Sequence, residues 1–127
     1  MSWFFEIVSI LRGFELHEAP YREISIEDKL ARYLESRNVS FQRQKTSRLG
    51  RYDLVILKEG HRIVLELKKK ATSSCVEQLD RYSRDFDGMI LMSYKSTRTL
   101  KAIFEIAKKS AKIPIEIVDI RDNCDLV

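Results

Sequence analysis

Two runs of aliphatic and β-branched residues, separated by a short polar turn, constrain the fold of this chain more than any other feature. The runs cover residues 51–57 and 62–68, and Glu59-Gly60 lies midway between them. Apolar runs joined by a turn that contains glycine are typical of a β-hairpin. With the turn centred between residues 59 and 60, residues whose numbers sum to 119 lie opposite each other. This register decides which side chains share a face.

The predicted register places two carboxylates against each other. Asp53 faces Glu66, and directly opposed Cβ atoms on one face are about 4.5–5.5 Å apart. Lys68 follows two residues later on the same face. Two acids on a covered sheet repel each other and lose hydration, and a hard divalent cation such as Mg²⁺ resolves that conflict. The pattern therefore predicts a divalent metal site with an amine beside it.

Two alternatives stay open at this point. Asp53 and Glu66 could be surface carboxylates at a fraying strand end, neutralised by nearby lysines. A three-residue turn with a bulge would also shift the pairing by one residue and separate the two acids.

The length and composition indicate one globular domain covering residues 1–127, of which 44% are hydrophobic and 33% charged. Residues 1–20 predict an apolar N-terminal helix that packs on the domain or pairs with a second copy, and residues 24–120 form the core. The helix is too short to span a bilayer and lacks a signal-peptide pattern, so we expect a cytoplasmic, intracellular protein without membrane contact. Cys75 and Cys124 have no ligand-like spacing and imply neither a zinc site nor a disulfide framework.

The formal charge of +4 is modest, but its distribution is informative. Cations precede Asp53 and follow Glu66, an arrangement that favours a polyanion such as DNA as the partner. The candidate DNA-binding residues are Arg43, Lys45, Arg48, Arg51, Lys69 and Lys70.

Apolar residues lie on both faces of the hairpin, which predicts helices on both sides of the sheet. Helices are expected over residues 25–38, from about 71 to 85, and from Ser96-Thr97 to about 109. Strands are expected over 39–45, 88–94 and 114–120. Ser25 is the expected N-cap of the first of these helices, and Ile106 belongs to the apolar stripe of the last. The fold class is therefore α/β, an α/β/α sandwich with a mixed central sheet.

These elements together carry a family resemblance. A helix with Glu27 near its start is followed by residues 50–56 with Asp53, residues 64–68 with Glu66 and Lys68, and the helical Gln-x-x-x-Tyr pattern of Gln78 and Tyr82. This order resembles the PD-(D/E)xK nuclease superfamily, which has the restriction-endonuclease-like fold. The Gln-x-x-x-Tyr element resembles its RecB-like branch, and the small size resembles archaeal Holliday-junction resolvases and Mrr-like modules. Tyr52 stands where the motif has proline, which weakens the branch assignment.

The resemblance implies roles for the individual residues. Asp53, Glu66 and the backbone carbonyl of Leu67 would bind Mg²⁺ or Mn²⁺, and Lys68 would position water and stabilise developing charge. Glu27 would serve the outer shell or a second ion; its alternative role is that of a helix-dipole partner.

The same resemblance gives Gln78 and Tyr82 the task of orienting Lys68 or a phosphate. The alternative is an ordinary helix with Tyr82 in the core. No small-molecule cofactor is expected.

The leading hypothesis is therefore a Mg²⁺-dependent deoxyribonuclease, an endonuclease or exonuclease, with branched DNA among its candidate substrates. One alternative is a nucleic-acid-binding module that does not cleave. Another is a nuclease subunit that is active only with a partner. A homodimer is also open, since resolvases of four-way junctions act as symmetric pairs.

Overall fold

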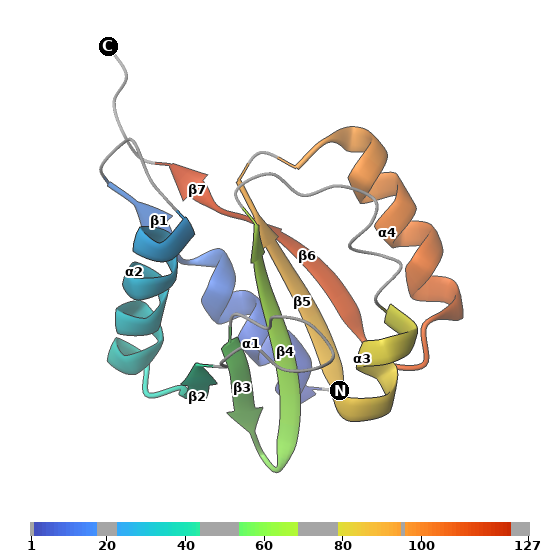
Figure 1. Cartoon of the computed structure of the whole chain (residues 1–127), viewed down its shortest axis with the longest axis horizontal. Coiled ribbons are helices and arrows are strands. Elements are labelled where there is room, and N and C mark those ends of the chain that lie inside the picture. The colour runs from blue at the N-terminus through green and yellow to red at the C-terminus, as the bar shows by residue number, and fades with distance from the viewer. Residues whose placement is uncertain (1, 18–22, 44–53, 69–78, 95, 123–127) are drawn as a thin grey trace.

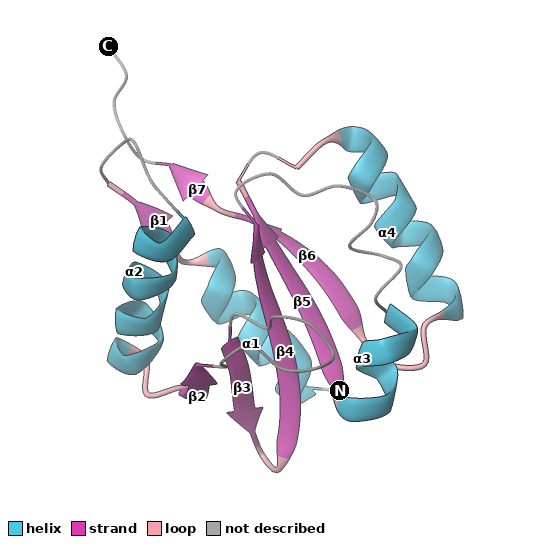
Figure 2. Cartoon of the chain, in the orientation of Figure 1, coloured by secondary structure: helices cyan, strands magenta, loops and turns pink. Residues whose placement is uncertain are grey.

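The chain folds around a five-stranded mixed sheet with helices on both faces (Figure 1). The computed structural model describes residues 2–17, 23–43, 54–68, 79–94 and 96–122. Figure 2 distinguishes the helices from the strands. The described helices are α1 (Ser2–Arg12), α2 (Glu23–Ser36), α3 (Leu79–Asp85) and α4 (Arg98–Ser110). The described strands are β1 (Glu15–Leu16), β2 (Ser40–Arg43), β3 (Leu54–Lys58), β4 (His61–Lys68), β5 (Gly88–Ser93), β6 (Ile115–Asp119) and β7 (Arg121–Asp122).

The predicted hairpin and its register are confirmed over the described residues. Strands β3 and β4 are antiparallel, and their pairs run from Lys58↔His61 to Leu54↔Leu65, each summing to 119. The turn has positive φ at both central residues, 50° at Glu59 and 80° at Gly60. Two positive φ values are the signature of a type I′ turn, which matches the twist of the strands and fixes the register.

The main sheet has the order β2-β3-β4-β5-β6. Strands β2, β3 and β4 form an antiparallel meander, whereas β5 and β6 run parallel to β4. The parallel pairing brings the carboxyl ends of β4, β5 and β6 to the same end of the sheet, because Lys68 pairs with Ser93 and Ser93 pairs with Asp119.

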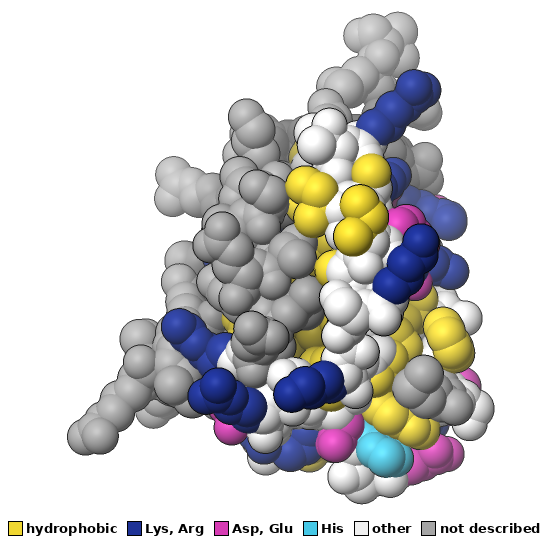
Figure 3. Space-filling view, turned by 90° about the vertical axis from the view of Figure 1, so that its right-hand side faces the viewer, with side chains coloured by type: hydrophobic (Ala, Val, Ile, Leu, Met, Phe, Trp, Pro, Cys, Tyr) yellow, Lys and Arg dark blue, Asp and Glu magenta, His cyan; other side chains and the backbone are white. Residues whose placement is uncertain are grey.

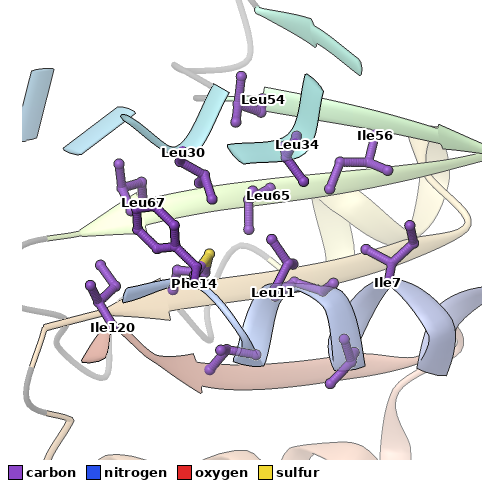
Figure 4. Packing of buried hydrophobic residues seen from close by; sticks show 14 of the residues in the cluster. Ile7, Leu11, Phe14, Leu30, Leu34, Leu54, Ile56, Leu65, Leu67 and Ile120 are labelled. Atoms are coloured by element: carbon purple, nitrogen blue, oxygen red, sulfur yellow. The ribbon is translucent and has the colours of Figure 1, made fainter. Parts of the chain in front are cut away.

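Two hydrophobic clusters lie on opposite faces of this sheet, as the alternation along β3 and β4 predicts. One joins Leu54, Ile56, Ile63, Leu65 and Leu67 to α1 and α2 (Figure 4). The other joins Val55 and Val64 to α3 and α4 through Tyr82, Phe86, Leu100 and Phe104. A sheet buried on both faces needs such continuous apolar strands, and β5 is buried at all six residues.

The apolar N-terminal segment is a helix that packs on the sheet. Its buried residues are Phe4, Ile7, Val8 and Leu11, and Figure 4 shows Ile7 and Leu11 pointing into the same cluster as the strand leucines. After α1, strand β1 pairs in parallel with β7 and forms a second, two-stranded sheet. The sequence carries no signal for this pair, because strands of two residues are too short to show alternation.

Two local expectations are wrong. Helix α2 begins at Glu23, so Ser25 lies inside its first turn and is not the N-cap. Ile106 is 69% exposed, although it was assigned to the apolar stripe of α4. Thr97 does cap α4, and its hydroxyl accepts a hydrogen bond from the Leu100 amide. The expected start of the third helix lies outside the described residues, and its end at Asp85 is confirmed.

No helix in the described part of the chain combines the length and the apolar character needed to cross a bilayer.

Candidate functional site

A buried carboxylate near the carboxyl end of β4 is the centre of the candidate site. Glu66 is 3% exposed, and Glu66 and Ser93 are the buried polar residues among the described part of the chain. Strand alternation gives Glu66 the same face as Val64, which belongs to the cluster under α3 and α4. A carboxylate removed from water in this way needs compensation from donors or cations.

Tyr82 supplies one such donor. Tyr82 is 2% exposed, and its hydroxyl donates a hydrogen bond to Glu66 Oε1. The ring also belongs to the α3–α4 cluster and meets Phe86 edge-on, with centroids 6.0 Å apart. The two alternatives for Tyr82 are thus combined, because the side chain is both a core residue and a polar partner. That partner is Glu66. The orientation of Lys68 or a phosphate by Tyr82 stays a prediction.

Lys68 lies on the other side of the carboxylate. Its Nζ is 3.9 Å from Glu66 Oε2, and its side chain is 42% exposed. The two oxygens of Glu66 therefore have different neighbours: Oε1 accepts from Tyr82, and Oε2 faces an ammonium that is half in solvent. A carboxylate oxygen is the kind of donor that Mg²⁺ prefers, so Glu66 fits one ligand position of such an ion.

The backbone carbonyl groups of β4 point alternately toward its two neighbouring strands. The carbonyl groups of Arg62 and Lys68 accept bonds from Asp87 and Tyr94 on the β5 side. Because successive carbonyl groups alternate along a strand, the carbonyl of Leu67 is directed to the β3 side.

Glu27 lies on a different element and forms a separate cluster. Arg43 Nε is 3.2 Å from Glu27 Oε1, and Arg43 Nη2 is 2.6 Å from Asp28 Oδ1. The bond to Asp28 raises the pKa of the Arg43 guanidinium above its ordinary value, and Glu27 adds to this effect against a smaller lowering by burial. Helix α2 packs on the face opposite Glu66, so the structure does not place Glu27 on the same face as Glu66.

The other predicted site residues lie outside the described part of the chain. They are Asp53, Gln78, Lys45, Arg48, Arg51, Lys69 and Lys70. Of the six candidate DNA-binding cations, Arg43 alone is described, and it is engaged with two carboxylates.

A row of polar residues at the carboxyl ends of β4, β5 and β6 was not predicted from the sequence. Lys68, Ser93 and Asp119 are paired across β4, β5 and β6, and adjacent strands are about 4.8 Å apart. Lys101 Nζ lies 2.7 Å from Asp119 Oδ2, and the Ser96 amide donates to Asp119 Oδ1 at 3.4 Å. The signal that could have found them is the rule that functional groups gather at the carboxyl ends of parallel strands.

Two opposing effects act on Asp119. Burial works to raise the pKa of its carboxyl group, but the hydrogen bonds from Lys101 and Ser96 and the Lys101 charge outweigh it and lower the pKa. Asp119 is therefore held as a carboxylate at neutral pH.

Within the described ranges, no three His, Cys, Asp or Glu side chains come together as a group that could hold a metal ion. No protein-family model, curated protein or solved structure matches this chain.

Proposed function

We propose that this chain is a metal-dependent DNA nuclease of the restriction-endonuclease-like type. The observation that carries the proposal is Glu66, a buried carboxylate with Tyr82 on one oxygen and Lys68 near the other. A buried acid fixed by a tyrosine and flanked by an amine is costly for stability alone, whereas a hydrolase uses such a group.

Asp53 is the second acid of the proposed site. In every described pair of β3 and β4, up to Leu54↔Leu65, the two residue numbers sum to 119. One more pair in the same register would set Asp53 opposite Glu66. Glu66 Oε2, Asp53 and the carbonyl of Leu67 would then bind Mg²⁺ or Mn²⁺.

Each residue has a distinct task in this proposal. Tyr82 holds Glu66 in one rotamer, so that Oε2 would be directed toward the proposed metal ion. Lys68, whose amine is partly in solvent, would orient the attacking water and stabilise charge that develops on the phosphate. A bound divalent ion would polarise the phosphodiester and lower the pKa of a water molecule.

The order of the elements supports the proposed restriction-endonuclease-like fold. From α2 to β6 the described elements run helix, three antiparallel strands, helix, strand, helix, strand, and helices cover both faces of the sheet. This is the order that the resemblance implies, and it supports the restriction-endonuclease-like part of the proposal. DNA is the proposed substrate because cations flank Asp53 and Glu66 in the sequence.

A cleavage assay tests the proposal. Purified protein is incubated with linear duplex, single-stranded and four-way branched DNA, in the presence of Mg²⁺ or Mn²⁺ and with a chelator. We expect cleavage of at least one substrate that the chelator abolishes. Asp53→Asn and Glu66→Gln should each reduce the rate by about 100-fold or more.

Glu35→Gln is the matched control, because Glu35 is an exposed carboxylate of α2 and its substitution should leave the rate unchanged. Folded protein that cuts none of the substrates contradicts the proposal. So does cleavage that survives both the chelator and Asp53→Asn. DNA binding that is indifferent to chelation, without cleavage, would instead identify a binding module.

A further inference from the structure

Phe5 is an exposed aromatic side chain on α1, a helix whose opposite face packs against the main sheet. Helix α1 buries Phe4, Ile7, Val8 and Leu11 against the sheet, yet Phe5 is 56% exposed. Its ring meets that of Phe4 edge-on with centroids 5.8 Å apart, which limits its freedom. Among the described residues, Phe5 and Ile106 are the exposed large hydrophobic side chains.

An apolar hollow lies directly beside Phe5. It has a volume of about 200 Å³ and is lined by Phe4, Phe5, Ile113, Pro114 and Ile115, together with Lys108 and Glu116. A cavity of roughly 150 Å³ is enough to hold a benzene ring. Viewed from the α4 side, hydrophobic side chains reach the surface in separate patches (Figure 3). The surface thus carries an aromatic knob and a hollow of matching size next to each other.

Two further depressions each share one lining residue with this hollow. Phe5 also lines a shallow depression along the outer face of α1 with Ser2, Glu6, Ser9 and Ile10. Glu116 is shared with a hollow along β6 that reaches Asp119. The three depressions lie beside α1 and β6, and together they are called the groove.

One outward amide of β6 is already engaged within the chain. Strand β6 has β5 as its partner in the main sheet, and the Ile120 amide donates toward β5, so the amide of Ile117 is directed outward. That amide already donates to Glu116 Oε1 at 3.1 Å, and Lys108 Nζ covers the same carboxylate at 3.0 Å. This contact discourages the pairing of an added strand at that position of β6.

The charges around the hollow are balanced. Glu6 is paired with Lys58 at 3.0 Å, and Glu116 is paired with Lys108. A locally neutral surface on a chain of charge +4 is unsuited to a polyanion, and it does not repel a second copy. Two-fold interfaces require one patch to complement itself. A knob beside a hollow of its own size meets that requirement.

We propose that this groove is a homodimer interface in which Phe5 of each copy inserts into the hollow of the other. The inference is independent of the proposed nuclease function, since it uses none of the residues around Glu66. Buried aromatic anchors dominate such interfaces.

The test is the mass of the full chain in solution, measured by sedimentation over a series of protein concentrations. The wild type should pass from one to two chains as the concentration rises. Phe5→Glu should weaken dimerisation by about 30-fold or more, which corresponds to the loss of one hot-spot side chain. Ile106→Glu is the matched control, an exposed hydrophobic residue on α4 outside the groove, and should dimerise as the wild type does.

A mixing experiment separates lost contact from lost folding. Ile113→Lys should also be monomeric, because the lysine fills the hollow. An equimolar mixture of Phe5→Glu and Ile113→Lys should recover a heterodimer, because the intact Phe5 of one chain meets the intact Ile113 of the other, and the introduced glutamate and lysine form a pair of opposite charges. A wild type that stays monomeric overturns the proposal. So does a dimer that Phe5→Glu leaves intact, a dimer that Ile106→Glu weakens equally, or a mixture that stays monomeric.

Discussion

Tyr82 joins helix α3 to strand β4 by donating a hydrogen bond to the carboxylate of Glu66, and both side chains are buried. Bonds from a hydroxyl to a carboxylate are stronger than those between neutral groups. Because Glu66 has little access to water, loss of this donor leaves part of its desolvation uncompensated.

We therefore expect Tyr82→Phe to lower the free energy of unfolding by about 1–3 kcal/mol, measured by urea denaturation without metal. In a double-mutant cycle with Glu66→Gln, the two changes should be coupled by at least about 0.5 kcal/mol. Tyr33→Phe is the matched control, since the Tyr33 hydroxyl donates to the Ile10 carbonyl at 2.6 Å. Its effect should add to that of Glu66→Gln; additivity for Tyr82 would contradict the structural bond.

The turn at the tip of the hairpin can be improved. Glu59 has a φ of 50°, a region that asparagine and glycine enter more easily than glutamate. Glu59→Asn should raise the free energy of unfolding by about 0.5–1 kcal/mol, as seen in thermal or urea unfolding.

Two controls accompany this change. Glu59→Ala should give no gain, because alanine has no preference for positive φ. Gly60→Ala should destabilise the protein, because Gly60 has a φ of 80° even though a methyl group would meet open space. A loss of stability in Glu59→Asn would mean that the turn is not of the type I′ form.

The lowered pKa of Asp119 makes a pH-dependent contribution to stability. The folded protein holds this carboxylate charged more strongly than the unfolded chain does, whose aspartates have a pKa of about 3.9. The contribution is present above that value and is lost as the pH falls through the lower folded-state pKa.

The wild type should therefore be more stable than Asp119→Asn at about pH 6, and the difference should shrink toward about pH 2. Lys101→Met removes the main cation and should flatten the same difference. A difference between wild type and Asp119→Asn that stays constant or grows on acidification would contradict this assignment.

Trp3 reports on how α1 sits against the hairpin, since the chain has one tryptophan. Its ring stacks on His61 with centroids 4.0 Å apart and planes 9° apart. His61→Ala should shift Trp3 fluorescence to longer wavelength and lower stability by about 0.5–1.5 kcal/mol, because it removes an aromatic stack. His17→Ala, at an exposed histidine after β1, should change neither quantity. An unchanged spectrum in His61→Ala would place Trp3 elsewhere.

Much of the fold could be predicted from local patterns. Alternation and a Gly-containing turn were sufficient for the β3–β4 register, and apolar residues on both strand faces were sufficient for helices on both sides. The stripe of α2 follows from spacing alone, with Ile26, Leu30 and Leu34 buried. The spacing in α4 misled at Ile106, since helical periodicity gives the direction of a side chain but not how far the sheet extends beneath it.

Some features of the candidate site also follow from local patterns, and others depend on tertiary packing. The sequence by itself determined that Glu66 and Lys68 share a strand and a face, because side chains alternate with a period of two. Only the tertiary structure decided that Tyr82 donates to Glu66, that Arg43 pairs with Glu27 and Asp28, and that Asp119 stands two strands from Lys68. These partners are 15 to 51 residues apart in the chain, so they depend on how helices and strands pack rather than on any local pattern.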